Sequence, residues 1–81
     1  MYRHLDVANN DISDLTGLDQ LQRLQCVNLA QNNLTDPAVV IGLAFLPDIQ
    51  WVNIQGNDMR ATQVQAVRDA FADKPQVTLL S

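Results

Sequence analysis

A phrase of eight residues occurs three times in this chain, at 5–12, 27–34 and 52–59, and it constrains the fold more than any other feature. Each copy has apolar residues at its first, third and last positions and an Asn at its sixth. The alternating apolar pair predicts a short strand with one buried face. An incomplete fourth copy begins at Val77, so successive copies start 22, 25 and 25 residues apart. Copies that recur every 22 to 25 residues indicate a stack of structural repeats.

The phrase resembles the repeat of leucine-rich repeat proteins. That resemblance implies an α/β solenoid, with a short parallel sheet on its concave face and 3₁₀ or helical connections on its convex face. Residues 10–18 are similar to the repeats of internalin-type bacterial proteins, and residues 56–79 resemble the last unit of many bacterial leucine-rich repeat proteins. Two departures are the missing N-terminal cap and a unit around Pro37 that is more helical than the internalin pattern.

The Asn of each phrase comes where the chain turns away from its strand. An Asn amide can both donate and accept hydrogen bonds, so it can satisfy backbone groups in its own turn and in the neighbouring turn. We therefore expect a structural ladder that consists of Asn10, Asn32 and Asn57.

The connections between the strands are expected to differ from one another. The second reads as a buried helix over 38–46, with Pro37 at its first position. The third reads as a helix that begins with a capping box of Thr62 and Gln65 and ends before Pro75. The first has a leucine at every third position, which suits an extended or 3₁₀ path. These leucines are Leu15, Leu18, Leu21 and Leu24.

We expect one leucine-rich repeat domain over 1–81, with repeats at about 2–23, 24–48 and 49–73 and a closing strand at 74–81. A solenoid normally has a polar cap at each end, and no cap precedes the first repeat. Three explanations are open. The chain is the C-terminal piece of a longer repeat protein, or it pairs with itself or another chain through that end, or Met1 and Tyr2 fold over it.

Composition narrows the class of partner. The net charge of −4 argues against nucleic acid, and no segment is long and apolar enough to cross a membrane. A single Cys excludes an internal disulfide. Met1 leads directly into the first repeat, so we expect no signal peptide. The compartment is therefore open: cytoplasmic if the chain is complete, secreted or surface-bound if it is a fragment.

Strand residues that point away from the core should form rows across the sheet, because neighbouring strands lie about 4.8 Å apart. Trp is a favoured anchor in protein interfaces, so we place Trp51 at the centre of a protein-binding patch. The alternative is a Trp that packs along the sheet and contacts no partner. The patch contains Trp51, Asn53, Asn28, Cys26, His4, Asp6 and Gln55. The expected rows are His4, Cys26, Trp51 and Gln76; then Asp6, Asn28, Asn53 and Thr78; then Ala8, Ala30, Gln55 and Leu80.

A catalytic interpretation of the same rows is weaker. A thiol beside an imidazole can act as a nucleophile, and Cys26 and His4 fall in one row with Asp6 nearby. Such a site also needs an oxyanion stabiliser and a closed pocket, and a sheet this short is open to water. We therefore expect no enzyme, no metal and no cofactor. The predicted function is non-catalytic protein binding through the concave sheet. The alternative is a structural or assembly role, as the C-terminal cap of a larger repeat protein or as a subunit that pairs through its first repeat.

Overall fold

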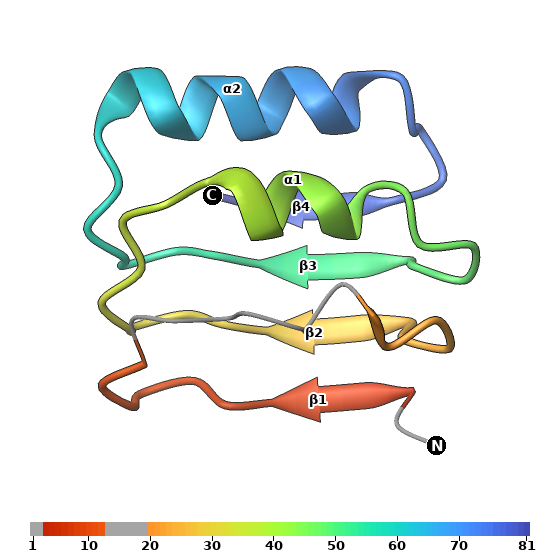
Figure 1. The fold of residues 1–81 in the computed structure, drawn as a ribbon, viewed down its shortest axis with the longest axis horizontal. Coiled ribbons are helices and arrows are strands. Elements are labelled where there is room, and N and C mark those ends of the chain that lie inside the picture. The colour runs from red at the N-terminus through yellow and green to blue at the C-terminus, as the bar shows by residue number, and fades with distance from the viewer. Residues whose placement is uncertain (1–2, 13–19) are drawn as a thin grey trace.

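A computed structural model describes residues 3–12 and 20–81. It contains a four-stranded parallel sheet in which each strand lies beside the next one along the chain (Figure 1). The strands are β1 (His4–Asp6), β2 (Cys26–Asn28), β3 (Trp51–Asn53) and β4 (Thr78–Leu80). This small α/β arrangement is consistent with a leucine-rich repeat fold. The expectations for Met1, Tyr2, Leu15 and Leu18 lie outside the described residues.

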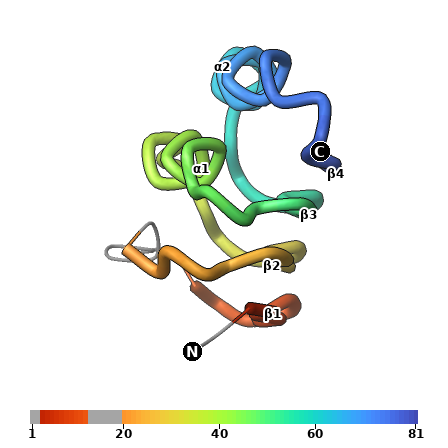
Figure 2. Tube along the Cα trace, turned by 90° about the vertical axis from the view of Figure 1, so that its right-hand side faces the viewer, coloured from red at the N-terminus to blue at the C-terminus, as the bar shows by residue number. Residues whose placement is uncertain are grey.

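Two helices, α1 (Ala38–Leu43) and α2 (Ala61–Ala72), lie on the same side of the sheet and pack against each other (Figure 2). On β2 and β3 and just after them, the apolar residues on that side are fully or almost fully buried, as are the helix residues opposite them, whereas Leu5 of β1 and Leu79 of β4 are partly buried. This core contains Val27, Leu29, Val52, Ile54, Val40, Leu43, Val67 and Phe71. Among the described elements, none covers the other side of the sheet. No helix of the described residues has the length and apolar character that a membrane span requires.

The helix ends differ from the sequence prediction. Helix α1 ends at Leu43 rather than residue 46, and Pro37 precedes the helix instead of opening it. The Oδ1 of Asp36 accepts the backbone N–H of Ala38 at 2.9 Å and so satisfies one donor of the first turn.

Helix α2 begins before the predicted capping box. The backbone N–H of Arg60 donates to Oε1 of Gln63 at 2.9 Å, which is the Gln half of a capping box two residues earlier than expected. Gln65 instead donates to Asp69 at 2.9 Å along the exposed side of the helix. The start of α2 is relevant to the sheet, because α2 and the connection after it lead directly into β4.

The strand register agrees with the prediction for β1 to β3 and differs for β4. His4, Cys26 and Trp51 are aligned with one another across the first three strands. Trp51 is aligned with Thr78, where Gln76 was expected, so β4 is displaced by two residues. Helix α2 has 12 residues where α1 has 6, and the extra length makes this the longest connection between described strands. A two-residue shift preserves which side chains face the core, because side chains alternate along a strand.

The residue before each Asn of the predicted ladder adopts the same rare backbone conformation. Asn9, Gln31 and Gly56 have positive φ values of 63°, 59° and 73°. Residues other than glycine rarely adopt a positive φ. The shared conformation turns the chain at the same point of each repeat. The side chain of Gln31 also lies directly over Gly56, where a Cβ would collide with it. Backbone hydrogen bonds join neighbouring turns as well, from Asn9 to Ala30 at 2.9 Å and from Gln31 to Gln55 at 2.8 Å.

Two of the three Asn residues link neighbouring repeats. Nδ2 of Asn32 donates to the carbonyl of Leu29 in its own repeat and to that of Val7 in the preceding repeat, both at 3.1 Å. Its Oδ1 accepts the N–H of Ile12 at 3.1 Å. Asn57 repeats this pattern one repeat further on, with the carbonyls of Ile54 and Leu29 and the N–H of Leu34. The same two side chains thus satisfy backbone groups that the turns remove from the sheet ladder.

Candidate functional site

The side of the sheet away from the helices, here called the open face, carries two short rows of side chains. The first row runs across the strands through His4, Cys26, Trp51 and Thr78. The second row runs through Asp6, Asn28, Asn53 and Leu80. In parallel strands, aligned residues point to the same side, so the two rows form one continuous surface.

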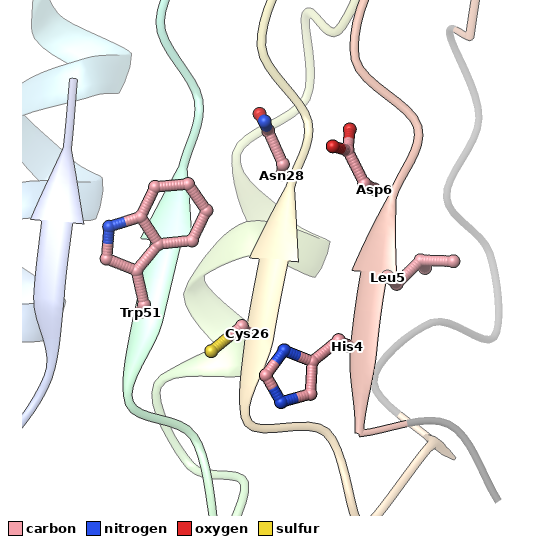
Figure 3. A pocket seen from close by; sticks show the side chains of 6 residues that line it. All are labelled: His4, Leu5, Asp6, Cys26, Asn28 and Trp51. Atoms are coloured by element: carbon pink, nitrogen blue, oxygen red, sulfur yellow. The ribbon is translucent and has the colours of Figure 1, made fainter.

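A pocket of about 210 Å³ opens on this surface between β1 and β3. Figure 3 shows the residues that line it and shows Leu5 pointing away from the other five side chains. Five of the seven residues that the sequence assigned to the patch therefore surround one depression. They are His4, Asp6, Cys26, Asn28 and Trp51. Asn53 lies beside Asn28 in the second row, outside the pocket lining, and Gln55 follows the end of β3 with an exposed side chain.

The second row is held by a repeated hydrogen bond within each strand end. Oδ1 of Asp6 accepts the N–H of Ala8 at 3.1 Å. Asn28 accepts from Ala30 at 3.2 Å, and Asn53 accepts from Gln55 at 3.0 Å, in the same way. Each side chain thus caps the backbone two residues later, as Asx turns do. The three side chains are fixed in equivalent orientations before any partner arrives.

The open face is polar but carries little charge. On the two rows, Asp6 is the one carboxylate and His4 the one imidazole, and both lie on β1. The positions on β2 to β4 are thiol, amide, indole, hydroxyl and alkyl groups. The side chains of Cys26, Asn28, Trp51 and Asn53 are partly buried.

The thiol and the imidazole both line the pocket, but no hydrogen bond joins His4 to Cys26 among the described residues. Cys26 is a free, partly buried thiol. No group of three or more His, Cys, Asp or Glu residues that could hold a metal ion is found in residues 3–12 and 20–81.

Sequence reasoning missed Leu80 as a member of the second row and placed Thr78 there instead. It also missed the caps formed by Asp6, Asn28 and Asn53. A signal for the caps was present in the sequence. In all three copies of the phrase, an Asp or Asn stands between the two alternating apolar residues. Asp and Asn are depleted in strands, and their recurrence there indicates a specific local role.

Comparison with known proteins gives two partial similarities. The chain is 35% identical over 71 residues to the geranylgeranyl transferase type-2 subunit alpha of Pongo abelii, which covers 88% of this chain and 12% of that protein. It is 40% identical over 55 residues to the subunit of the same name in Homo sapiens, which covers 68% of this chain and 10% of that protein. The chain thus spans about a tenth of the length of these relatives. No protein-family model matches it.

These similarities correct one prediction. The expectation that the chain is not an enzyme is contradicted, because both relatives are named as a subunit of a transferase, which is a component of an enzyme. The word subunit in both names describes a protein that is one part of an assembly. The prediction of a protein partner is therefore consistent with these relatives. Neither relative is bacterial, and neither supports the internalin-type resemblance.

Proposed function

We propose that this chain binds a protein partner through the open face, with Trp51 as the anchor. The observation that carries the proposal is the pocket beside Trp51, which lies on a side of the sheet that no described element covers. Indole rings combine a large apolar area with a donor nitrogen, and they are enriched among the residues that dominate binding energy. The neighbouring donors of Asn28 and Asn53 supply polar contacts around that anchor.

The proposal includes the architecture that places this face. We propose that residues 1–81 form one leucine-rich repeat domain and that the open face is the concave side of its solenoid. The parallel strands in chain order, the stacked turns and the bonds of Asn32 and Asn57 across repeats support this assignment. The internalin-type resemblance rests on the sequence of residues 10–18 alone.

Affinity capture with matched variants tests the binding proposal. The immobilised chain is compared with Trp51→Ala and with Phe45→Ala, which removes an aromatic ring that is 70% exposed and lies two residues beyond the end of α1. We expect a partner that the wild type and Phe45→Ala retain and that Trp51→Ala loses, with a fall in affinity of at least about tenfold. Equal retention by all three proteins would count against the open face as the binding surface.

A second candidate function is assembly through the outer edge of β1. Leu5, Val7 and Ile12 are only partly buried, whereas the equivalent residues of the next repeat are buried. A strand edge with incompletely covered apolar residues can recruit another strand. This candidate makes the chain a terminal cap of a larger repeat protein or a subunit that pairs through its first repeat.

Light scattering in dilute solution separates this candidate from the first. The assembly candidate expects Leu5→Asp or Val7→Asp to change the molar mass or the solubility, while Trp51→Ala leaves the molar mass unchanged. A monomer that stays monomeric in every variant would argue against pairing through β1.

The relatives suggest a setting in which either role would operate. We propose that the protein that carries this chain acts in a geranylgeranyl transferase as one of its subunits, as the names of the relatives state of them. The protein should then co-purify from its source with geranylgeranyl transfer activity. If the purified protein carried none of that activity, and all of the activity were recovered in fractions without the protein, the proposal that it is a transferase subunit would be refuted.

A further inference from the structure

The caps in the second row decide which polar groups remain for a partner. In Asn28 and Asn53 the side-chain oxygen accepts a backbone N–H of its own strand end, at 3.2 and 3.0 Å. An Asn side chain has one acceptor oxygen and one amide nitrogen with two donor hydrogens. The nitrogen makes no hydrogen bond to any described residue, so it is the group that these side chains have available for a partner.

The row therefore has a fixed polarity from β1 to β4. Asp6 has only acceptor oxygens, and one of them is used by Ala8. Asn28 and Asn53 offer donors, and Leu80 ends the row with an alkyl group. The two donors stand on neighbouring strands, and neighbouring strands of a sheet lie about 4.8 Å apart. The order along the row is thus one negative charge, two donors and one apolar group.

We propose that this row binds an extended polypeptide segment that crosses the strands and presents its main-chain carbonyl oxygens to Asn28 and Asn53. A Lys or Arg of the segment lies against Asp6, and an apolar side chain enters the pocket beside Trp51. The inference rests on the proposed protein-binding function and names the chemistry of its partner. Carbonyl oxygens fit better than carboxylates, because Asp6 is the next residue of the row and would repel a second negative charge.

The variant Asn→Asp isolates the donor from the cap. It keeps the Oδ1 that accepts the backbone N–H, removes both donor hydrogens and adds one negative charge. The first repeat already has Asp at the equivalent position, with the cap formed at 3.1 Å, so the strand end accommodates this side chain. Asn33→Asp is the matched control: it makes the same chemical change at an exposed residue outside the two rows. Urea unfolding of each variant verifies that the fold is retained.

The experiment uses a displayed library of random linear peptides, selected on the wild-type chain. We expect a consensus with a basic residue near an aliphatic one. Asn28→Asp and Asn53→Asp should each weaken the selected peptides by about tenfold, and Asn33→Asp should leave their affinity unchanged. Asp6→Asn, which retains the cap oxygen, should remove the preference for the basic residue. Replacing single peptide carbonyls by thiocarbonyls, which are weaker acceptors, should reduce affinity at one or two positions of the consensus.

Each other result overturns a defined part of the account. Peptides that lose affinity with Trp51→Ala but not with Asn28→Asp or Asn53→Asp would refute the donor row and leave the proposed binding face intact. Peptides that are indifferent to Trp51→Ala as well, or a failure to select any, would refute both. Self-association of the wild type that Trp51→Ala abolishes would assign the face to a second copy of the chain instead of an unrelated peptide.

Discussion

The first and second repeats contain the same apolar phrase, yet only the second is fully buried. Leu5 and Val7 are partly exposed, whereas their counterparts Val27 and Leu29 are 0% exposed. Both pairs face the same side of the same sheet. The difference lies in their neighbours, because β2 has a strand on each side and β1 has a described strand on one side only. Burial in this fold is set by position in the stack as much as by the residue itself.

The two Asn residues of these repeats show the same contrast in hydrogen bonding. Asn32 is 4% exposed and joins four backbone groups of two repeats. Asn10 is exposed, and its Nδ2 donates to Val7 at 2.8 Å and to Ala8 at 3.3 Å within its own repeat. An identical residue at an identical position of the phrase therefore makes different hydrogen bonds, within one repeat for Asn10 and between two described repeats for Asn32.

The largest expected effect comes from shortening one leucine in each repeat. Leu29→Ala should lower the free energy of unfolding by about 2–5 kcal/mol, because it leaves a cavity in a fully buried site. Leu5→Ala should cost about 1 kcal/mol, because its side chain is already partly in water. Urea titration with a common slope measures both. Equal losses would show that the first repeat is as well packed as the second and would break the comparison.

Removal of the linking amide should have the next largest effect. Asn32→Ala leaves the N–H of Ile12 without its acceptor. It also removes one of two amide donors from the carbonyls of Val7 and Leu29, which keep Asn10 and Asn57 respectively. The loss should be about 1–3 kcal/mol. Asn10→Ala should cost less than about 1 kcal/mol, since water can replace its bonds. Thermal unfolding at matched concentrations is a sufficient measurement. A loss at Asn10 as large as that at Asn32 would indicate that Asn10 is also buried against other residues in solution.

The smallest effect concerns the turn that precedes each Asn. Gly56→Ala should destabilise the chain by about 1–2 kcal/mol, because a residue with a Cβ is strained at a φ of +73°; the amide end of the Gln31 side chain would also have to move aside. Gln31→Gly relieves strain at a φ of 59° and should change stability by no more than about 1 kcal/mol. Differential scanning calorimetry resolves the pair if Gly56→Ala lowers the melting temperature and Gln31→Gly does not. A neutral Gly56→Ala would mean that residue 56 does not hold the positive φ that the turn requires.

The sequence sufficed to predict the parts of the fold that repeat the same phrase of residues. The apolar pairs led by Leu5, Val27 and Val52 fixed the strands and the register of β1 to β3, because each copy repeats the same local chemistry. The register of β4 was wrong by two residues, because Val77 imitates the start of the phrase while the long helix α2 carries the chain further before pairing begins. The spacing of a phrase cannot show which of two residues of equal parity forms the pair.

The candidate site was predictable in its residues but not in its chemistry. Alternation along the strands placed His4, Cys26 and Trp51 on one side, and the structure brings them around one pocket. The state of each amide depends on turns that the pattern does not describe. The caps of Asn28 and Asn53 arise from the backbone path after the strand, and that path decides that their oxygens are used and their nitrogens are available.

Amide hydrogen exchange at two equivalent positions tests the central claim, that position in the stack sets the stability of each repeat, most directly. The N–H of Leu29 donates to the backbone carbonyl of Asn53 at 2.8 Å, and the N–H of Val7 donates to the backbone carbonyl of Asn28 at 3.0 Å. Both amides are therefore bonded to the next strand of the sheet. We predict that Leu29 exchanges only through global unfolding, whereas Val7 exchanges at least about tenfold faster through local opening of the first repeat. Equal protection of the two amides under the same conditions would contradict the claim.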